Sequence, residues 1–321
     1  MPIPQAVRKD KFIYINVGGD WYYYNYTSPP IGGGSMGTVY LGRSKSTGNQ
    51  VAIKQVAESI QNIPSIRSRA RLEGSMKFRH HNLVEMIGYC ELDHSKGPIW
   101  VVSKLVRGIN LDYHVTHNLV DYKDALFRII DTMYPVLSAL SFLHSNGIFH
   151  LDIKPTNIMV EDGKNIRLMD LGICSQGIAS VVENTGLLGT PQFAAPEQFH
   201  LDAENNLINA STDVYQVGIS LYQLLTNSNP FSAPTIHECM NLHETRILPY
   251  HKDVPNEIVD VLRKATNPNQ KERFQTAEEF KIALKNTVRD IKEKPKKKKR
   301  LYWAIAAIAI ILLIIVITSS L

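Results

Sequence analysis

The stretch HLDIKPTN, residues 150–157, decides how the rest of the sequence is interpreted. It places an acid at Asp152, a base at Lys154 and an amide at Asn157 within six residues. Asp152 can accept a proton from a hydroxyl that attacks phosphorus, Lys154 can neutralise charge on a transferred group, and Asn157 offers an amide oxygen to a divalent cation. Eighteen residues after Asp152, RLMDLG ends an expected strand with Asp170, whose carboxylate can hold Mg²⁺. Each residue is commonplace in a loop, so their order along the chain carries the interpretation.

A glycine-rich stretch lies upstream, IGGGSMGTVY at residues 31–40. It follows the pattern G-x-G-x-x-G-x-V, formed by Gly32, Gly34, Gly37 and Val39. Glycines let a hairpin backbone approach phosphates closely, although the pattern alone equally fits a plain flexible turn. A dinucleotide-binding loop needs a helix directly after the glycines, whereas TVYLGR continues here as an expected strand. This context favours a phosphate-covering hairpin.

Lys54 follows in the motif VAIK, as the lone cation on an otherwise apolar strand. Such a lysine usually extends its charged end to water while its stem covers apolar surface. Near a glycine hairpin, the same ammonium can instead bind phosphate oxygens. The two features together predict the first half of a nucleotide site, and the residues around Asp152 and Asp170 predict the second half.

The charge of the chain is concentrated at one end. The 321 residues carry a formal net charge of +5, yet the stretch from Lys292 to Arg300 holds seven basic residues and one acid. This stretch contributes +6 and leaves −1 for the remainder, so we expect no nucleic-acid partner. The three cysteines, Cys90, Cys174 and Cys239, have neither metal-type nor paired spacing, which indicates a reducing compartment.

After the basic run, LYWAIAAIAIILLIIVITSSL at residues 301–321 carries no charge. About 20 such residues match a ~30 Å hydrocarbon core, which predicts a C-terminal transmembrane helix. The cations before it, and only three small polar residues after it, place the body on the cytoplasmic side. The basic run itself fits either a topology signal, which is the simpler interpretation, or a site for anionic lipid. The N-terminal residues lack the continuous apolar segment of a signal peptide.

The remaining chain divides into a strand-rich and a helix-rich part. Up to about Val102, FIYINV, WYYYNY, GTVYLGR, QVAIKQV and PIWVVSKLV predict short strands, interrupted by one helix over about residues 63–78. After Gly108, helices are predicted for ALFRIIDTMYPVLSALSFLHSNG, TDVYQVGISLYQLLTNSNP and TAEEFKIALKNTVRDI. We expect an α+β fold with two lobes that join near residue 105. The expected divisions are an N-terminal extension with an extra hairpin at 1–21, the main domain at 22–291, a basic linker at 292–300 and the transmembrane helix at 301–321.

In this order, the motifs resemble those of the eukaryotic-type serine/threonine protein kinase family, over about residues 22–291. The glycine loop, VAIK, HLDIKPTN and DLG stand in family order, and APE follows at Ala195 to Glu197. DVYQVG from Asp213 resembles the helix whose aspartate braces the catalytic loop, and ERF supplies Arg273 as the expected buried partner of Glu197. The resemblance implies a bilobal kinase-like fold with a small β-rich N-lobe and a larger helical C-lobe.

The resemblance also implies chemical roles. Asp152 is the expected base, and Lys154 and Asn157 complete the expected catalytic residues. Asn157 and Asp170 are the expected ligands of Mg²⁺. Lys154, together with Thr190 in GTPQFAAPE, resembles kinases that phosphorylate serine or threonine.

ATP is the implied cofactor beside Mg²⁺. Lys104 to Val106 lie in the expected hinge, whose backbone hydrogen-bonds the adenine, and Ser103 would face the adenine pocket. The residues expected to contact the nucleotide are Gly32, Gly34, Ser35, Gly37, Val39, Ala52, Lys54, Glu73, Lys104 and Val106.

One departure from the family pattern concerns the partner of Lys54. The family's helix glutamate normally lies nine residues before the histidine of HHNLV, and Arg71 occupies that position here. Glu73, seven residues before His80, is the nearest acid and the expected partner. A solvated surface acid is the other interpretation of Glu73.

A second departure lies beside the expected base. Most relatives have arginine where Leu151 stands, and that arginine binds a phosphate on the activation segment. Leucine cannot form this charge-assisted contact. We therefore expect that phosphorylation of the segment between Asp170 and Glu197 is not the main activating step.

These features predict a membrane-anchored serine/threonine protein kinase whose favoured substrates are proteins at the same membrane. The alternatives are a catalytically weak or inactive pseudokinase scaffold, and a kinase of small molecules, which the APE segment disfavours. The displaced glutamate and Tyr215, where tryptophan is usual, favour the scaffold, whereas the intact polar residues favour catalysis. The tyrosine-rich stretch before the glycine loop is expected to form a packed or partner-facing surface, and self-association is one use for it.

Overall fold

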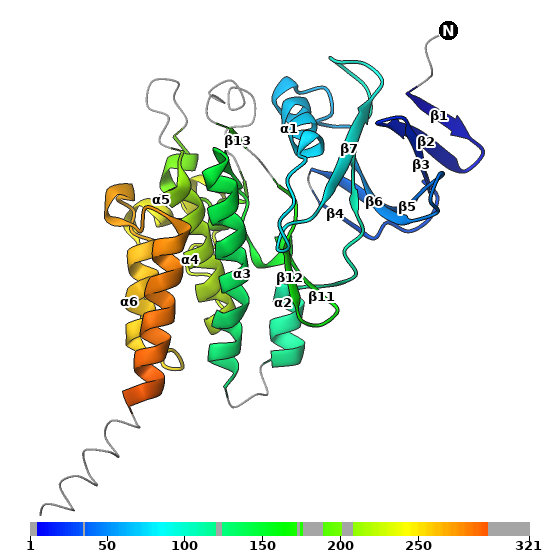
Figure 1. The fold of residues 1–321 in the computed structure, drawn as a ribbon. Helices are drawn as coiled ribbons and strands as arrows, with labels where there is room; N and C mark the ends of the chain where they lie inside the picture. Colours follow the sequence, from blue (N-terminus) through cyan, green and yellow to red (C-terminus); the bar gives the residue numbers. More distant parts are fainter. Residues whose placement is uncertain are drawn as a thin grey trace, which may run out of the picture.

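The computed structural model describes residues 5–34, 36–119, 124–171, 174–175, 189–200 and 208–294 of the chain. It has a β-rich lobe and a helical lobe, side by side in Figure 1. The β-rich N-lobe contains β1 (Ala6–Lys9), β2 (Phe12–Val17), β3 (Asp20–Asn25), β4 (Gly32–Gly34), β5 (Gly37–Ser44), β6 (Gln50–Val56), α1 (Pro64–Ser75), β7 (Met86–Glu91) and β8 (Ile99–Lys104). The two-lobed α+β architecture expected from the sequence is therefore present.

The helical C-lobe begins after a short connection. Its first half contains β9 (Gly108–Asn110), α2 (Leu111–His114), the π-helical turn η1 (Val115–Leu119), α3 (Ala125–Ser145), β10 (Ile148–Phe149), the 3₁₀ turn η2 (Pro155–Asn157), β11 (Ile158–Glu161), β12 (Asn165–Leu168) and β13 (Cys174–Ser175). Its second half contains the 3₁₀ turns η4 (Pro191–Phe193) and η5 (Pro196–Gln198), α4 (Ala210–Thr226), α5 (Ile236–Thr245), α6 (Asn256–Ala265), the 3₁₀ turn η6 (Gln270–Glu272) and a last helix over residues 277–294.

The N-lobe is built on one antiparallel sheet of eight strands. Seven strands follow the order β1-β2-β3-β5-β6-β8-β7, and β4 pairs with β5 beside this path. The registers place Val39 opposite Lys54 and Ala52 opposite Ser103. Because directly paired residues, and residues two apart on one strand, share a face of a sheet, these four side chains lie on one face.

The N-terminal hairpin extends this sheet and curls it back on itself. β2 pairs with β3 along its whole length, and a Cβ atom at Gly88 on β7 would lie only 2.2 Å from Cγ1 of Val17 on β2. The Cys90 thiol also donates to the carbonyl of Gln5, 3.1 Å away. The two ends of the sheet thus pack together around a second hydrophobic core, formed by Ile15, Val17, Tyr22, Tyr24, Val51, Ile53, Cys90, Trp100 and Val102.

The tyrosines of this hairpin divide between the two faces of the sheet. Tyr24 is buried in the second core, where its hydroxyl accepts a hydrogen bond from Trp100 Nε1 at 2.9 Å and donates one to Gln55 at 2.6 Å. On the opposite face, half-buried Tyr14 stacks on Tyr23 with 5.4 Å between ring centroids. The hairpin therefore belongs to the N-lobe sheet and forms a packed surface, as the sequence suggested.

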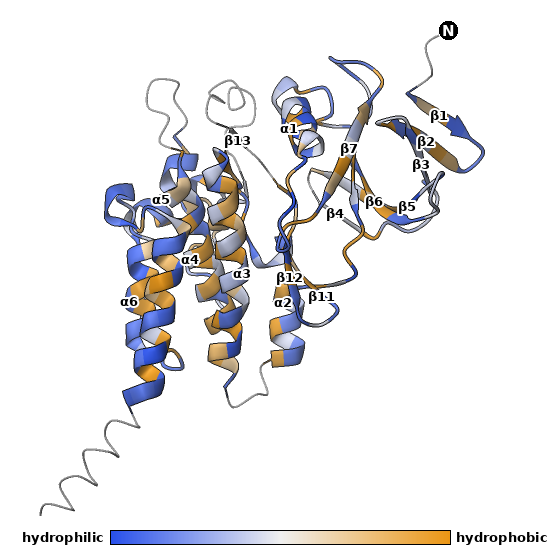
Figure 2. Cartoon of the chain, viewed as in Figure 1, coloured by the Kyte–Doolittle hydropathy of each residue, from blue (hydrophilic) through white to orange (hydrophobic). Residues whose placement is uncertain are grey.

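The C-lobe core is built by apolar faces of its helices. α3 and α4 bury Met133, Leu137, Leu140, Val217 and Leu221 completely. Figure 2 shows hydrophobic residues on α3 and α4 and hydrophilic residues along the outer sides of the lobe. The three helices predicted from apolar spacing after Gly108 are all present, as α3, α4 and the helix over residues 277–294.

The last helix extends three residues into the expected basic linker. Phe280, Leu284 and Val288 anchor it in the C-lobe core. At its end, Lys292 lies over the Phe127 ring, 4.5 Å from its centroid, and Lys294 forms an ion pair with Glu257 on α6. These contacts explain why the helix continues through residue 294.

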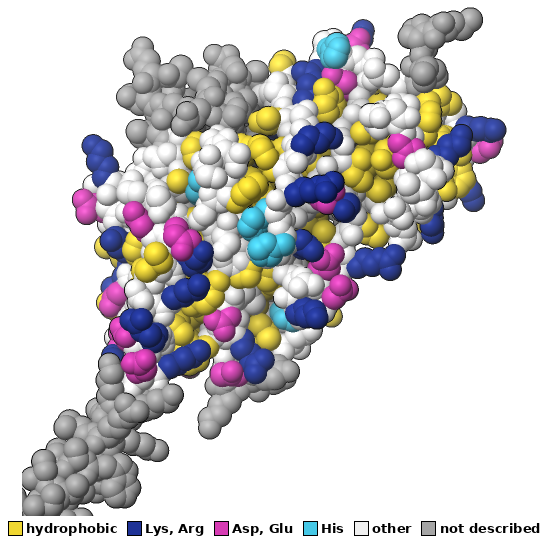
Figure 3. Space-filling view, viewed as in Figure 1, with side chains coloured by type: hydrophobic (Ala, Val, Ile, Leu, Met, Phe, Trp, Pro, Cys, Tyr) yellow, Lys and Arg dark blue, Asp and Glu magenta, His cyan; other side chains and the backbone are white. Residues whose placement is uncertain are grey.

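In the part of the chain that the structure describes, α3 is the one helix long and apolar enough to cross a membrane by length and composition. Its apolar residues pack in the C-lobe core, so it is a core helix of this lobe. The predicted transmembrane segment at 301–321 lies outside the described residues. Figure 3 shows basic and acidic side chains interspersed over the C-lobe, as the near-neutral charge of the body implies.

Candidate active site

The glycine-rich stretch forms a hairpin between β4 and β5. Gly32 pairs with Val39, and the chain continues from Gly37 as strand β5 without an intervening helix. Gly37 has φ +153°, and a Cβ atom there would lie 2.2 Å from the Gln55 carbonyl oxygen on β6, so only glycine fits. Ser35 lies outside the described residues.

Lys54 meets two carboxylates that come from distant parts of the chain. Its Nζ lies 3.1 Å from Oδ1 of Asp170 and 3.6 Å from Oε2 of Glu73. Burial favours the neutral amine, but the two carboxylates outweigh it and hold the pKa of the Lys54 ammonium above its ordinary value. The lysine is therefore a fixed cation between the lobes.

The two carboxylates differ in their surroundings. Lys54 holds the pKa of Asp170 below its ordinary value. Burial raises the pKa of Glu73, which is only 8% exposed, and Lys54 offsets this effect in part. Glu73 is thus a buried partner of the lysine and not a solvated surface acid.

α1 carries Glu73 and is shorter than the sequence suggested. Pro64 begins it, a residue that suits a first helical turn, and it ends at Ser75, whereas the expected helix reached residue 78. Arg71, at the position where the family glutamate was expected, points to the other side of the helix and binds Glu91 on β7, with 2.9 Å between its Nε and Oε1 of Glu91. Glu73, and not the residue at position 71, is therefore the residue of α1 that reaches Lys54.

The carboxylate of Asp152 is hydrogen-bonded or ion-paired to three neighbouring side chains. Its Oδ1 accepts from the Thr190 hydroxyl at 2.7 Å, and its Oδ2 accepts from Asn157 Nδ2 at 3.0 Å. Lys154 Nζ lies 3.1 Å from the same Oδ2 and donates to the Thr190 hydroxyl at 2.6 Å. The Thr190 hydroxyl thus lies between the Asp152 carboxylate and the Lys154 ammonium, which shows that this pair of charged groups can hold a hydroxyl.

A single buried carboxylate holds the loop that carries Asp152. Asp213 at the start of α4 has no exposed surface and accepts from the backbone N–H groups of His150 at 2.9 Å and Leu151 at 2.8 Å. Its Oδ2 also lies 2.8 Å from His144 Nε2. This arrangement matches the bracing aspartate that DVYQVG suggested.

These elements arrange a glycine hairpin, a paired lysine and a loop aspartate around one interlobe site, and the comparison with known proteins agrees. The model of the protein kinase domain family matches residues 26–283, more than half of the chain. The chain belongs to the protein kinase family. Similar proteins are serine/threonine-protein kinase PknB of Mycolicibacterium smegmatis and of Mycobacterium tuberculosis, each 31% identical over 79% of this chain and 41% of theirs. Serine/threonine-protein kinase PrkC of Bacillus subtilis is 29% identical over 79% of this chain and 39% of its own length.

The chain thus spans about two fifths of the length of these relatives.

The kinase site has oxygen donors that fit Mg²⁺. Asn157 Nδ2 donates to the Asp152 carbonyl oxygen at 2.8 Å, which leaves the Asn157 amide oxygen as the atom able to bind a cation. The Asp170 side chain is 48% exposed, so its carboxylate is accessible. Among the described residues, no group of three or more His, Cys, Asp or Glu side chains could hold a metal. The Asn157 amide oxygen and the Asp170 carboxylate are oxygen donors of the kind that suits Mg²⁺, which takes one or two protein ligands besides phosphate and water.

The hinge residues join the lobes as expected. Lys104 ends β8, where its N–H donates to the Glu85 carbonyl at 2.9 Å and its ammonium pairs with the Glu85 carboxylate at 2.7 Å. Val106 packs against the C-lobe core. Ser103 lies on the same sheet face as Ala52 and Lys54, so these residues can line one nucleotide site.

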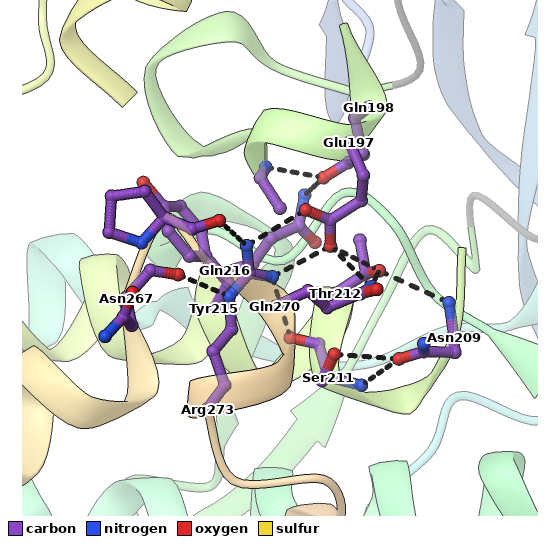
Figure 4. Close-up of polar contacts among 12 residues, drawn as sticks. Glu197, Gln198, Asn209, Ser211, Thr212, Tyr215, Gln216, Asn267, Gln270 and Arg273 are labelled. Atoms are coloured by element: carbon purple, nitrogen blue, oxygen red, sulfur yellow. Dashed lines mark hydrogen bonds and ion pairs between the residues drawn. The ribbon is translucent and has the colours of Figure 1, made fainter. Parts of the chain in front are cut away.

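The kinase C-lobe also contains the predicted pair of Glu197 and Arg273. The two form a bidentate ion pair at 2.8 and 3.0 Å, and both are almost completely buried (Figure 4). Thr212 donates to the same carboxylate at 2.7 Å, and the Arg273 guanidinium lies over the Tyr215 ring, 4.6 Å from its centroid. Tyr215 is therefore a buried structural residue here.

Several residues of this site stand outside any motif that indicates their role. His144, Gln198 and Gln216 contact the catalytic loop or its brace, yet each stands in a segment whose pattern only predicts a helix or a turn. Thr190 was noted for its motif, but its hydrogen bond to Asp152 was not foreseen.

Proposed function

We propose that the chain is a serine/threonine protein kinase that transfers the γ-phosphoryl group of ATP to protein hydroxyls. The observation that carries the proposal is the convergence of Lys54, Glu73 and Asp170 from three distant elements, beside a loop that presents Asp152. The names of the similar proteins agree with this activity. A pseudokinase scaffold would not need the lysine held between two carboxylates, so its case is weaker.

In this proposal each residue has a defined task. Lys54 binds phosphate oxygens of ATP beneath the glycine hairpin, and Asn157 and Asp170 hold Mg²⁺, which supplies neutralising charge when bound. Asp152 accepts the proton of the substrate hydroxyl. Lys154, 3.1 Å from Asp152, neutralises charge on the transferred group. Catalysis then consists largely of positioning and charge stabilisation.

The replacement Asp152→Asn tests the assignment. The amide cannot accept the hydroxyl proton, so we expect phosphoryl transfer to a generic protein substrate to fall at least ~100-fold, the scale of general-base catalysis. Nucleotide affinity should stay unchanged, because the proposed ATP contacts lie elsewhere. Transfer of radiolabelled phosphate and nucleotide titration measure the two quantities. Turnover at the wild-type rate in Asp152→Asn would refute the assignment.

We further propose that the apolar tail anchors this kinase in a membrane, with the catalytic domain on the cytoplasmic side. The support is the uncharged sequence at 301–321 behind a basic run. The test compares the full chain with a chain that ends at residue 294, by sedimentation with membranes after carbonate washing. We expect the full chain in the pellet and the shortened chain in the supernatant, and equal distribution of both would contradict the anchor.

The leucine beside Asp152 supports a third proposal, that phosphorylation of the activation segment is not the main activating step. Leu151 is buried and has no group that binds phosphate. The candidate sites Ser180 and Thr185 lie outside the described residues. We expect Ser180→Ala combined with Thr185→Ala to change kcat less than about twofold. A collapse of activity that Ser180→Glu and Thr185→Glu restore would show that a phosphate is required.

A further inference from the structure

Two glutamine side chains meet at one backbone carbonyl of the catalytic loop. Gln198 ends η5, and Gln216 lies in the second turn of α4 (Figure 4). Both have no exposed surface, and each donates from Nε2 to the carbonyl oxygen of Leu151 at 3.0 Å. We call Gln198 and Gln216 the carboxamide pair.

The backbone around the pair fixes the orientation of both amides. Gln198 Oε1 accepts from the N–H of Ala195 at 2.8 Å, and Gln216 Oε1 accepts from the N–H of Ile153 at 2.9 Å. Since a backbone N–H can only donate, both oxygens must face these groups, and both NH₂ groups are left to face Leu151. Gln216 Nε2 also donates to Gln198 Oε1 at 2.9 Å, which joins the two side chains.

The carbonyl that they hold belongs to an unusual residue. Leu151 has φ +63°, in the left-handed region that costs a residue with a side chain about 1 kcal/mol or more. Its N–H is bound by Asp213, so both of its backbone groups are held from α4. Because a peptide unit is planar, the Leu151 carbonyl also sets the plane from which the Asp152 backbone begins. The carboxamide pair therefore acts on the proposed base through one peptide plane.

The same carbonyl connects the catalytic loop with the segment at residues 189–200. Gln198 belongs to this segment, and a Cβ atom at Gly189 would lie 2.4 Å from the Leu151 oxygen. Thr190 donates to the Asp152 carboxylate. The described contacts that seat the segment on the loop thus include uncharged amide and hydroxyl donors.

We propose that the carboxamide pair positions Asp152 and couples its geometry to the seating of residues 189–200, without a phosphate. This inference rests on the proposed kinase activity. Both glutamines are fully buried and lie outside the proposed ATP contacts, so we assign them as positioning residues. Their loss should affect turnover and not nucleotide affinity.

The test replaces Gln216 by methionine, which has a similar shape but cannot donate to the carbonyl. We expect kcat to fall 10- to 100-fold, as for a small misplacement of a catalytic group, with the dissociation constant of ATP within about twofold of wild type. Gln223→Met is the matched control, since Gln223 lies two turns further along α4 and no described contact joins it to the catalytic loop. It should retain kcat within about twofold.

A second variant, Gln198→Met, removes the other donor and also serves if Gln216→Met does not fold, as judged by thermal unfolding. Since both amides act through one carbonyl, the kcat of the double variant should be only slightly lower than that of the less active single variant. Folded variants that keep the wild-type kcat would overturn the inference. So would a loss of ATP affinity as large as the loss of kcat, or a double variant in which the two single losses of kcat multiply. An inactive wild-type protein would instead refute the proposed function, so the two failures can be told apart.

Discussion

At the scale of single residues, backbone hydrogen bonds to buried side chains explain much of the site geometry. Asp213 reaches two successive N–H groups of the catalytic loop, and its carboxylate is satisfied although it has no exposed surface. A buried carboxylate without such donors would cost several kcal/mol, so its position and the loop conformation depend on each other. The left-handed Leu151 is held in the same way.

His243 on α5 allows a prediction about pH. Its ring is buried and stacks on Phe231 with 4.5 Å between centroids. Nε2 donates to the Pro191 carbonyl at 2.9 Å, so Nδ1 accepts from the Tyr215 hydroxyl at 2.7 Å. Burial, with a further contribution from Arg273, lowers the pKa of His243 from 6.5 to about 4. The folded protein therefore keeps this imidazole neutral.

The unfolded chain takes up the proton first as the pH falls, because its imidazole has the ordinary pKa. The free energy of unfolding should therefore decrease as the pH falls from about 6.5 to about 4, by up to ~3 kcal/mol from this group. Urea unfolding across this range should show a steeper decline for wild type than for His243→Gln, which has no such group. Parallel curves for the two proteins would contradict the assignment, whatever the absolute stability of the variant.

How far the sequence predicted the site can be judged at this scale. Lys54, Asp152 and Asp170 were found because each stands in a short motif whose residue types the chemistry requires. The carboxamide pair was not found, because a glutamine in a helical pattern gives no indication of whether it faces water or a carbonyl. Residue types reveal chemistry directly, whereas positioning contacts depend on which elements pack together.

At the scale of elements, α1 is locked to the N-lobe sheet by a buried charged cluster. Arg67 is 1% exposed and donates to the Glu91 carboxylate at 2.8 Å and to the carbonyls of Gln61 and Gly97 at 2.8 and 2.7 Å. Arg71 binds the same carboxylate, whose pKa is lowered because these cations outweigh its burial. The helix that presents Glu73 to Lys54 is thus held in place by contacts within its own lobe.

Replacing Glu91 by alanine should leave the Arg67 guanidinium buried without its counter-charge. We expect the free energy of unfolding to fall by about 3–5 kcal/mol, as measured by urea denaturation. The ATP concentration for half-maximal activity should rise, because α1 no longer holds Glu73 against Lys54. Glu85→Ala is the control: its partners Lys104 and Arg79 are exposed, so about 1 kcal/mol or less is expected. Equal losses of unfolding free energy in the two variants would argue against a structural role for the buried cluster of Arg67, Arg71 and Glu91.

The element scale also shows where sequence patterns stop being informative. The spacing of apolar residues located α3, α4 and the last helix, and the motif context correctly excluded a helix after the glycines. The end of α1 was missed by three residues, because its boundary depends on contact with β7, where a Cβ atom at Gly74 would lie 2.6 Å from the Tyr89 Cβ. Such close packing of a helix on a strand is a tertiary feature that local periodicity does not contain.

At the scale of the whole molecule, the kinase domain has two separate hydrophobic cores. One extends from α1 into the helical lobe, and the other lies inside the curled sheet that the N-terminal hairpin completes. The sequence predicted two lobes and an extra hairpin, but not that Tyr24 of the hairpin would pack with Trp100 in a core of its own. Successive residues of a strand face opposite sides of the sheet, but three consecutive tyrosines do not show which side is buried. The buried side follows only from where the chain returns.

The way the last helix packs limits how far an anchored enzyme can reach. Residues 277–294 are fixed to the C-lobe, so only residues 295–300 separate a rigid body from the apolar tail. Six residues span at most ~20 Å even when fully extended. In the anchored enzyme that we propose, the catalytic cleft would therefore stay close to the lipid surface, and hydroxyl groups of proteins near that surface would be its substrates.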